Sequence, residues 1–369
     1  MMSTSQPSPA SVQLAFHRSL RRHSELYFST GDIILSAGFG DARTLFCVHR
    51  VVLSHHSPIF EDMFAIPLQP DANELYDGLP VVCLYDELED VEAFLGFLYN
   101  FGISLRRLDP DTPLRVRGIL KLAAKYQVDS VRARIIQRLE EDWPTSALSW
   151  LRFSNDEKLY SEDCARYLAL EDGKYPEDHF PEPAAAIRLA RDFDIPSILP
   201  AAYLRLLYAD PTLNWDDLRQ KRASGAPGRS VRSARWHLLD HVDMLRVAQG
   251  RLRLVQSLPH VHRAFLLGGQ ACQSAADADE EEDDSTPNCH QIIVRKHDEF
   301  SATRYSSFWT GVDEAGRPDP IAVLQKLRDA AGDWKMCASC TELFRSRVAG
   351  EIKRLWDDLP RVFGLVTES

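Results

Sequence analysis

The sequence lacks the features of an exported or membrane-spanning chain. It has no N-x-S/T sequon, and its seven cysteines are an odd number spread along 369 residues, which does not fit a secreted disulfide framework. No stretch approaches the roughly 18 to 20 apolar residues that a membrane helix requires, and the N-terminus lacks the apolar core of a signal peptide. We therefore expect an intracellular protein without membrane contact, in the cytoplasm or the nucleus.

The motifs of common enzyme classes are also absent. The chain has no Gly-rich phosphate loop of Walker type and no G-x-S-x-G nucleophile elbow. The formal net charge of -11 argues against a whole-molecule nucleic-acid binder, because phosphate contact needs a basic face. No residue is nominated as catalytic, so we expect a protein that is not an enzyme.

The first 142 residues predict an α+β domain. Its elements follow the order β-β-α-β-α, with strands at 31–38, 43–50 and 79–86 and helices from Pro58 and over 89–101. The first two strands are expected to form an antiparallel hairpin. Ser57 supplies a capping hydroxyl before a proline at the first helical position. Residues 69–78 are expected to be a polar loop.

Helical periodicity dominates after residue 113. Two amphipathic helices, broken near residues 127–129, are expected to complete the domain near residue 142. The remaining residues, 143–369, predict a mainly α-helical region that contains a proline-rich linker at 173–183.

The helical region also echoes the end of the first domain. Residues 119–139 align with residues 186–206 at an offset of 67, matching Leu122, Ala123, Ser130, Arg138 and Leu139 with Leu189, Ala190, Ser197, Arg205 and Leu206. Both copies describe a helix, a tight break and a second helix. We interpret the match as two helical hairpins that pack in a similar way more than as a duplication, since stacked repeats need several units.

Two runs of opposite charge mark the helical region. Residues 218–263 carry ten Lys or Arg against two Asp or Glu, whereas DADEEEDD at 277–284 holds seven acids in eight residues. The plainer interpretation is a disordered acidic loop near 273–288 beside a solvated basic surface. The sharper one is a nucleic-acid or acidic-partner site at 219–263. A helix from about Trp236 to Val255 is expected there, with an apolar stripe of Leu239, Val242, Leu245, Leu252 and Val255.

Four cysteines form a candidate metal site. Cys337 and Cys340 form a C-x-x-C that heads an expected helix, whose core stripe is Leu343, Phe344, Val348, Ile352 and Leu355. Cys272 and Cys289 complete a set of four thiolates, which zinc accepts in tetrahedral geometry. The alternative is a pair of buried thiols in a helical hairpin with no cofactor. A redox pair would need a preceding strand, which the sequence does not indicate.

Four ordered blocks of the first 142 residues resemble the BTB/POZ domain family. They are GDIIL at 31–35, FCVHRVVLSHHSPIFEDMF at 46–64, DGLPVVCLYDELEDVEAFLGFLYN at 77–100 and LKLAAKYQVDSVRARI at 120–135. The resemblance implies a BTB/POZ domain at 25–142. Composition predicts a tail and short helix at 1–24 before it, and helical periodicity predicts the helical region at 143–369 after it. The resemblance also implies fold-holding roles for Asp32, Phe46, Val48, His49, Leu53, Ser57, Phe60, Met63 and Phe64. The sequence DGLPVV at 77–82, together with the long helical region, is similar to that of BTB proteins expanded in mushroom-forming fungi.

The histidines of the second block fit a structural role better than a metal or catalytic one. The imidazole of His49 is expected to bond the backbone or a nearby acid. His55 and His56 are adjacent, so they cannot share one helical face, and they are expected at the turn between two helices.

The resemblance implies a protein–protein interaction module that self-associates or recruits partners. Residues 12–24 look helical and basic, whereas strand-swapped members of the family have a β-rich lead, so swapping is not expected. One alternative is a substrate adaptor of a cullin-type ubiquitin ligase, with residues 65–78 and 113–127 facing the scaffold, although Leu68 and Asp71 match the cullin-binding pattern loosely. The other is a nucleic-acid-linked regulator that uses residues 219–263.

Overall fold

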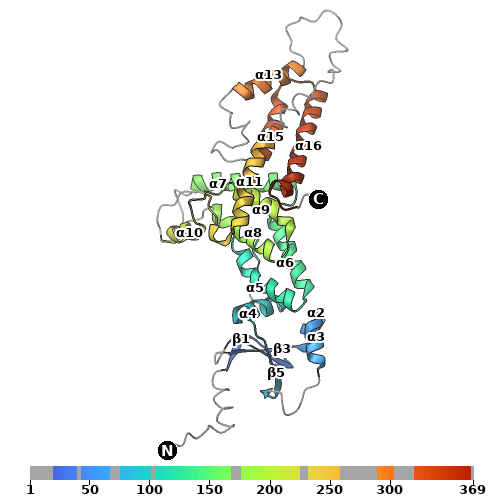
Figure 1. Ribbon diagram of the computed structural model, residues 1–369, viewed down its shortest axis with the longest axis vertical. Helices are drawn as coiled ribbons and strands as arrows, with labels where there is room; N and C mark the ends of the chain where they lie inside the picture. The colour runs from blue at the N-terminus through green and yellow to red at the C-terminus, as the bar shows by residue number, and fades with distance from the viewer. Residues whose placement is uncertain are drawn as a thin grey trace, which may run out of the picture. The chain divides into compact units, whose positions relative to one another are not determined.

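The computed structural model describes residues 20–39, 43–66, 75–100, 105–167, 176–224, 232–257, 289–302 and 320–366. The chain divides into two compact units (Figure 1). Unit 1 comprises Met1–Arg107 and Thr112–Leu139, and unit 2 comprises Leu108–Asp111 and Glu140–Ser369. A small curled sheet with flanking helices is followed by a mostly helical region, which confirms the predicted α+β fold class.

Unit 1 is built on a mixed five-stranded sheet in the order β1-β3-β2-β5-β4. The strands are β1 (Leu20–Tyr27), β2 (Ile33–Ala37), β3 (Arg43–Val48), β4 (Leu75–Tyr76) and β5 (Leu79–Cys83). Strands β2 and β3 pair antiparallel, as the hairpin prediction required, and β2 pairs parallel with β5. Every residue of β2 is buried, as expected for a strand that is covered on both faces.

The turn between β4 and β5 ties the sheet to β1. Asp77 and Gly78 have φ values of 52° and 78°, which a two-residue hairpin turn of this handedness requires. The Asp77 carboxylate accepts hydrogen bonds from the Arg22 guanidinium at 2.8 Å and from the Tyr27 hydroxyl at 2.6 Å. Burial, followed by this carboxylate contact, raises the pKa of Tyr27. Tyr27 and Tyr76 from these strands pack against the buried cluster of Ile34, Leu45 and Cys47.

Strands β1 and β4 correct two expectations. Residues 20–24, which were expected to be helical, are extended because Leu20, Arg21 and Arg22 pair in parallel with β3. The rest of that segment, residues 12–19, lies outside the described residues. The expected loop at 69–78 ends in β4, which pairs antiparallel with β5. In both places strand pairing outweighs local sequence preference.

Five helices accompany this sheet in sequence. They are α2 (Arg50–His56), α3 (Pro58–Ala65), α4 (Leu88–Leu98), α5 (Thr112–Lys125) and α6 (Asp129–Asp142), and the division between the units falls within α6. Helices α4 and α5 approach closely at Gly118, where a Cβ atom would lie 2.1 Å from Asp90 Oδ1. The Asp90 carboxylate pairs with Lys121 at 2.8 Å, and the buried Asp86 carboxylate accepts from Lys125 at 2.7 Å.

The internal echo is reproduced in the geometry of two turns. Gln127 and Asp194, 67 residues apart, have φ values of 51° and 52°. The N–H of Val128 donates to the carbonyl of Ala123 at 2.8 Å, and the matching N–H of Ile195 donates to the carbonyl of Ala190 at 2.8 Å. Both turns therefore end a helix with one left-handed residue and a bond spanning five residues, as in a Schellman motif.

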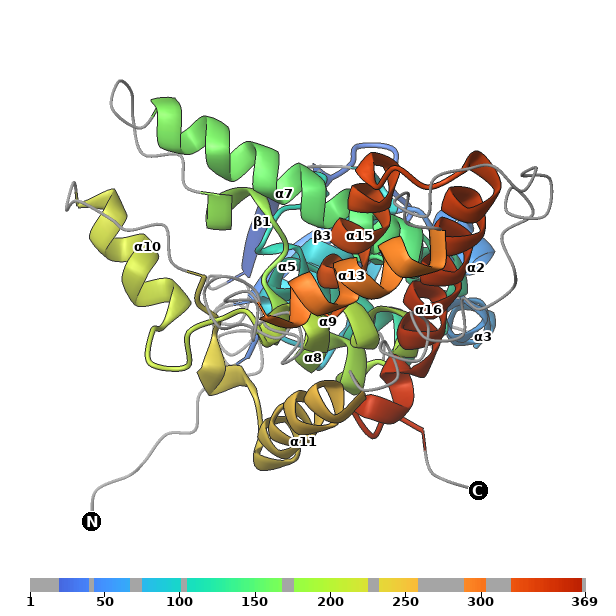
Figure 2. The same cartoon turned by 90° about the horizontal axis from the view of Figure 1, so that it is seen from above.

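Unit 2 is mostly helical in its described ranges, with one isolated β-bridge between Asn214 and Ala234. Its longer helices are α7 (Ala147–Tyr167), α8 (Pro183–Asp192), α9 (Leu199–Leu206), α10 (Trp215–Ala223), α11 (His241–Ser257), α13 (Cys289–Ala302), α15 (Pro320–Ala330) and α16 (Ala338–Val362). Helices α15 and α16 form a hairpin that α7 packs against (Figure 2). No helix in the described ranges has the length and apolarity needed to cross a bilayer.

Three expectations for unit 2 are wrong. Residues 180–183 of the expected linker are buried, because the Glu182 carboxylate caps α8 through the N–H groups of Ala184 and Ala185. On α11, Leu245 and Leu252 of the predicted apolar stripe are 57% and 58% exposed, so this part of the stripe is not buried. On α16, Leu343 is exposed, whereas Phe344, Val348, Ile352 and Leu355 are buried as expected. Which side of these long helices is buried depends more on the neighbouring elements than on the apolar pattern of the sequence.

Candidate functional site

Asp32 and His49 organise the start of α2. The Asp32 carboxylate accepts a hydrogen bond from the Arg50 N–H at 2.7 Å and so satisfies one of the unpaired donors of the first helical turn. The His49 N–H donates to the Tyr99 hydroxyl at 3.0 Å, and the His49 Nε2 lies 3.0 Å from the Thr30 hydroxyl. The His49 imidazole therefore contacts the hydroxyl groups of Thr30 and Tyr99, and not the acid or backbone group that was expected. These contacts give His49 a structural role.

Ser57 links the α2–α3 turn to the end of α5. Its hydroxyl accepts from the Phe60 N–H at 3.0 Å and donates to the Tyr126 carbonyl at 2.5 Å. The Phe60 ring stacks on the Tyr126 ring with centroids 4.5 Å apart. The Tyr126 hydroxyl donates to Asp86 at 2.6 Å, and burial followed by this bond raises the pKa of Tyr126.

The other signature residues line the interior or its margin. Phe46, Val48 and Leu53 are fully buried, whereas Met63 and Phe64 are half-buried. His55 and His56 end α2, as expected, and His56 Nδ1 lies 3.3 Å from the Ser130 hydroxyl. The sequence did not reveal the partners Tyr99 and Tyr126, because both lie far along the chain from the histidine and serine that they contact.

Unit 1 also exposes large apolar side chains. They are Phe39, Val51, Ile66, Leu75, Tyr85 and Leu114. Val51 is 74% exposed on α2, one turn before His55 on the same helical face. Exposed apolar groups beside charged ones are typical of a protein-binding surface when they gather on one element.

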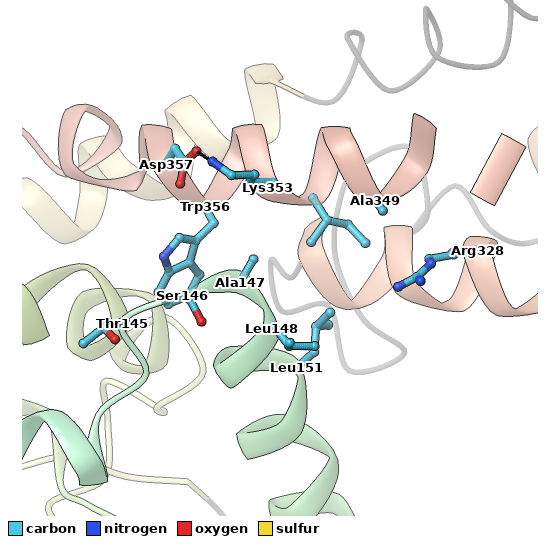
Figure 3. Close-up of a pocket in the computed structure, with 11 residues that line it drawn as sticks. Thr145, Ser146, Ala147, Leu148, Leu151, Arg328, Ala349, Lys353, Trp356 and Asp357 are labelled. Atoms are coloured by element: carbon cyan, nitrogen blue, oxygen red, sulfur yellow. Dashed lines mark hydrogen bonds and ion pairs between the residues drawn. The ribbon is translucent and has the colours of Figure 1, made fainter. Parts of the chain in front are cut away.

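Unit 2 contains a cavity of about 370 Å³, which falls within the usual range for ligand pockets. The start of α7 forms one wall with Ala147, Leu148 and Leu151, and α16 forms another with Ala349, Ile352 and Trp356 (Figure 3). Thr145, Ser146, Arg328, Lys353 and Asp357 complete the lining. No sequence motif pointed to this cavity, because its walls come from helices that are distant in sequence.

The chemistry of the cavity favours binding over catalysis. Lys353 pairs with Asp357, whereas no described carboxylate lies within ion-pair distance of Arg328. The buried Arg328 Nε has no hydrogen-bond partner in the described part of the chain. The Ser146 hydroxyl lies 2.9 Å from the Ser149 hydroxyl, and the lining holds no His or Cys that would activate it. An apolar pocket with a guanidinium that has no ion-pair partner among the described residues suits an apolar group that carries a carboxylate.

Four arginines of the basic segment 219–263, namely Arg219, Arg232, Arg235 and Arg246, form ion pairs inside unit 2. The buried Arg235 contacts Asp111 at 2.6 Å and Asp216 at 3.0 Å. Arg219 also pairs with Asp111 at 2.6 Å. The pKa of Asp111 is lowered: burial alone would raise it, but the hydrogen bonds from Arg219 and Arg235 together have the larger effect. Arg232 pairs with Glu157.

These pairings count against an open phosphate-binding face. Four of the ten basic side chains of the segment bind acids of the same unit, so fewer are available for phosphate. The acidic run 277–284 lies outside the described residues.

Three of the four candidate metal ligands come together. The Sγ atoms of Cys289, Cys337 and Cys340 all lie within 4.8 Å of one another, and no disulfide joins them. Cys289 is buried and the other two are half-buried. Cys272 lies outside the described residues.

Comparison with known proteins identifies the first unit. Residues 27–142 match the BTB/POZ domain family, which confirms the resemblance seen in the four sequence blocks. No curated protein matches the chain. BTB/POZ domains are non-enzymatic and mediate protein–protein interactions in general. Residues 27–142 are therefore a BTB/POZ domain, and a mostly helical region follows it.

Proposed function

We propose that this chain is an intracellular interaction protein whose BTB/POZ domain self-associates and whose helical region recruits a second protein. The match of residues 27–142 to the BTB/POZ family carries the proposal, because domains of this family act by binding proteins. From the wording DGLPVV at 77–82 we infer the subtype expanded in mushroom-forming fungi.

The α2–α3 hairpin supplies the proposed self-association surface. Its inner residues Leu53 and Phe60 are buried, yet Val51 is 74% exposed and Ile66, directly after α3, is 67% exposed. The exposed acids Glu61 and Asp62 follow on α3. Apolar residues flanked by charges match the composition of interfaces, which typically bury about 1,200 to 2,000 Å² in total.

Sedimentation velocity of the full-length chain tests this surface. Val51→Glu should shift the protein toward monomer, because it places a charge where apolar area is buried between copies. Leu114→Glu, at a 43% exposed leucine of α5, is the matched control and should leave self-association unchanged. Equal effects of the two variants, or none, would remove α2 from the interface.

A cullin-type ubiquitin ligase adaptor is the alternative. Leu114, near the start of α5, is one exposed apolar residue of the helix expected to face the scaffold. Residues 67–74, which include Leu68 and Asp71, lie outside the described residues. Mixing the full chain with the N-terminal domain of the host's BTB-binding cullin separates the two functions. In an adaptor, Leu114→Glu should abolish the complex and Val51→Glu should not.

The cavity of unit 2 is the proposed docking point for the second protein. Its apolar walls and the unpaired Arg328 favour a partner segment that offers an apolar side chain close to an acidic one. Lys353 contributes less to acid recognition, because Asp357 already neutralises it.

Two leucines of α7 give a matched test of this docking point. Leu148 is 57% exposed and lines the cavity, whereas Leu159 is 51% exposed and does not. Proximity labelling from the full chain in host cells should lose a defined set of proteins in Leu148→Glu and Arg328→Ala but keep it in Leu159→Glu. Loss of the same proteins in all three variants, or in none, would exclude the cavity as the docking point.

A further inference from the structure

We propose that unit 2 holds one zinc ion on the thiolates of Cys289, Cys337 and Cys340. The site is independent of the BTB/POZ domain and of the cavity. Its residues come from two separate segments, the first residue of α13 and the N-terminal end of α16.

The spacing of the sulfur atoms fits a tetrahedral metal. Zinc–thiolate bonds are about 2.3 Å long, so two sulfurs on one zinc ion lie roughly 3.8 Å apart. All three Sγ atoms already lie within 4.8 Å of one another. A metal ion therefore requires each pair of sulfurs to close by no more than about 1 Å, a shift that side-chain rotation supplies.

Backbone N–H groups point at the sulfurs in the way that thiolates require. The Cys337 N–H donates to Cys289 Sγ at 3.2 Å, and the Cys340 N–H donates to Cys337 Sγ at 3.4 Å. Cys337 is also the N-cap residue of α16, where the helix dipole favours negative charge. Donated hydrogen bonds and a helix N-terminus both stabilise the thiolate over the thiol. On binding, each thiol releases its proton to solvent as its bond to zinc forms.

The surroundings favour metal over a redox pair. The described residues before the C-x-x-C, 320–336, form α15 and a 3₁₀ turn and contain no strand, whereas a thioredoxin-like pair follows one. Soft thiolates select zinc, copper(I) or iron–sulfur clusters, and of these zinc accepts three thiolates with a fourth ligand. In the described part of the chain no fourth His, Cys, Asp or Glu joins the cluster.

Bound zinc would connect two segments that are far apart in the sequence. Cys289 and Cys337 are 48 residues apart, so a metal between them closes a long loop and lowers the entropy of the unfolded chain as a disulfide does. The metal would hold α13 beside the start of α16, where Trp334 packs on Phe344 with ring centroids 5.2 Å apart. The role is structural.

Metal content of the full-length chain, purified under reducing conditions without chelators, tests the site. We expect one zinc ion per chain in the wild type and its loss in Cys337→Ser and Cys289→Ser. Cys83→Ser is the matched control, since Cys83 is a half-buried thiol of β5 in unit 1 that accepts from Arg43 at 3.1 Å. It should retain the metal.

A second measurement does not depend on the variants folding. Wild-type protein loaded with cobalt(II) should show the thiolate-to-metal charge-transfer band of a sulfur-rich tetrahedral site, and X-ray absorption of the zinc form should count at least three sulfur ligands. Wild type that binds no zinc after equilibration with excess metal would overturn the proposal. So would a zinc shell of only oxygen and nitrogen, or an intact mass lower by two hydrogens that reveals a disulfide among these cysteines.

Discussion

Replacing Ser57 with alanine tests whether the α2–α3 turn depends on one buried hydroxyl. The Ser57 side chain is 1% exposed and makes two hydrogen bonds, one accepted from the Phe60 N–H and one donated to the Tyr126 carbonyl. Alanine leaves both backbone groups without a partner in a site that water does not reach. The two segments that the hydroxyl joins are 69 residues apart.

The magnitude follows from these two bonds. Loss of a serine N-cap costs about 1 kcal/mol, within a range of roughly 0.5 to 2. An unpaired buried carbonyl costs about another 1 kcal/mol. The sum of about 2 kcal/mol corresponds to a roughly 30-fold faster exchange of amides that open with the domain, since each 1.4 kcal/mol is a factor of ten.

Hydrogen exchange followed by mass spectrometry is the suitable assay, because all seven tryptophans lie at residue 143 or later and their fluorescence does not report on unit 1. Peptides from α3 and α5 should exchange faster in Ser57→Ala. Ser54→Ala is the matched control on α2, since Ser54 is half-buried and should respond only through helix propensity, by no more than about 0.5 kcal/mol. Exchange in Ser57→Ala within about threefold of that in Ser54→Ala would mean that the Ser57 hydroxyl does not hold the turn.

Three further predictions concern charge and backbone strain. Arg205→Met should destabilise unit 2 by about 2 kcal/mol in urea titrations followed by tryptophan fluorescence, because the buried Glu157 loses its contact with Arg205 at 2.9 Å and keeps the contact with Arg232 at 3.2 Å. Arg188→Met, at a partly exposed pair with Asp192, is the control and should cost less than about 1 kcal/mol. The N–H of Asp243 and the guanidinium of Arg191 lower the pKa of Asp240 from 3.8 to about 2. Because this pKa is depressed in the folded state, the stabilisation that the Asp240 carboxylate provides is present above about pH 4 and is lost as the pH falls toward 2. Asp240→Asn should therefore flatten the dependence of Tm on pH in that window. An unchanged slope would contradict the assignment. Gln127→Gly should slow hydrogen exchange in α5 and α6, because glycine adopts the left-handed conformation of residue 127 without strain. The net gain in the free energy of unfolding should be up to about 1 kcal/mol after the entropy cost of glycine. Asp194→Gly should gain less stability, and equal gains would argue against strain at Gln127.

Local chemistry in the sequence located the elements whose signals are short-range. The β2–β3 hairpin and the Ser57-Pro58 helix start lie where turn and capping preferences place them. The offset of 67 pointed to two turns whose φ values agree within a degree, although neither turn contains the glycine that usually marks such a break.

Features that depend on partners distant in sequence were not predictable in this way. The strand conformation of β1 comes from pairing with β3, and residues 180–183 are buried because Glu182 caps α8 and also accepts the N–H of Arg235 at 3.0 Å. The exposure of Leu245 and Leu252 shows that α11 lacks a described neighbour on its apolar stripe. The cysteine pattern located three sulfurs that meet, because C-x-x-C fixes two of them on one turn and Cys289 was the nearest further thiol along the chain.

Self-association of the proposed kind should be visible in sedimentation velocity of the wild-type full-length chain over a range of micromolar concentrations. The chain has a mass of 41.9 kDa. We expect a species of twice that mass whose fraction rises with concentration. A single species of 41.9 kDa at every concentration would contradict it.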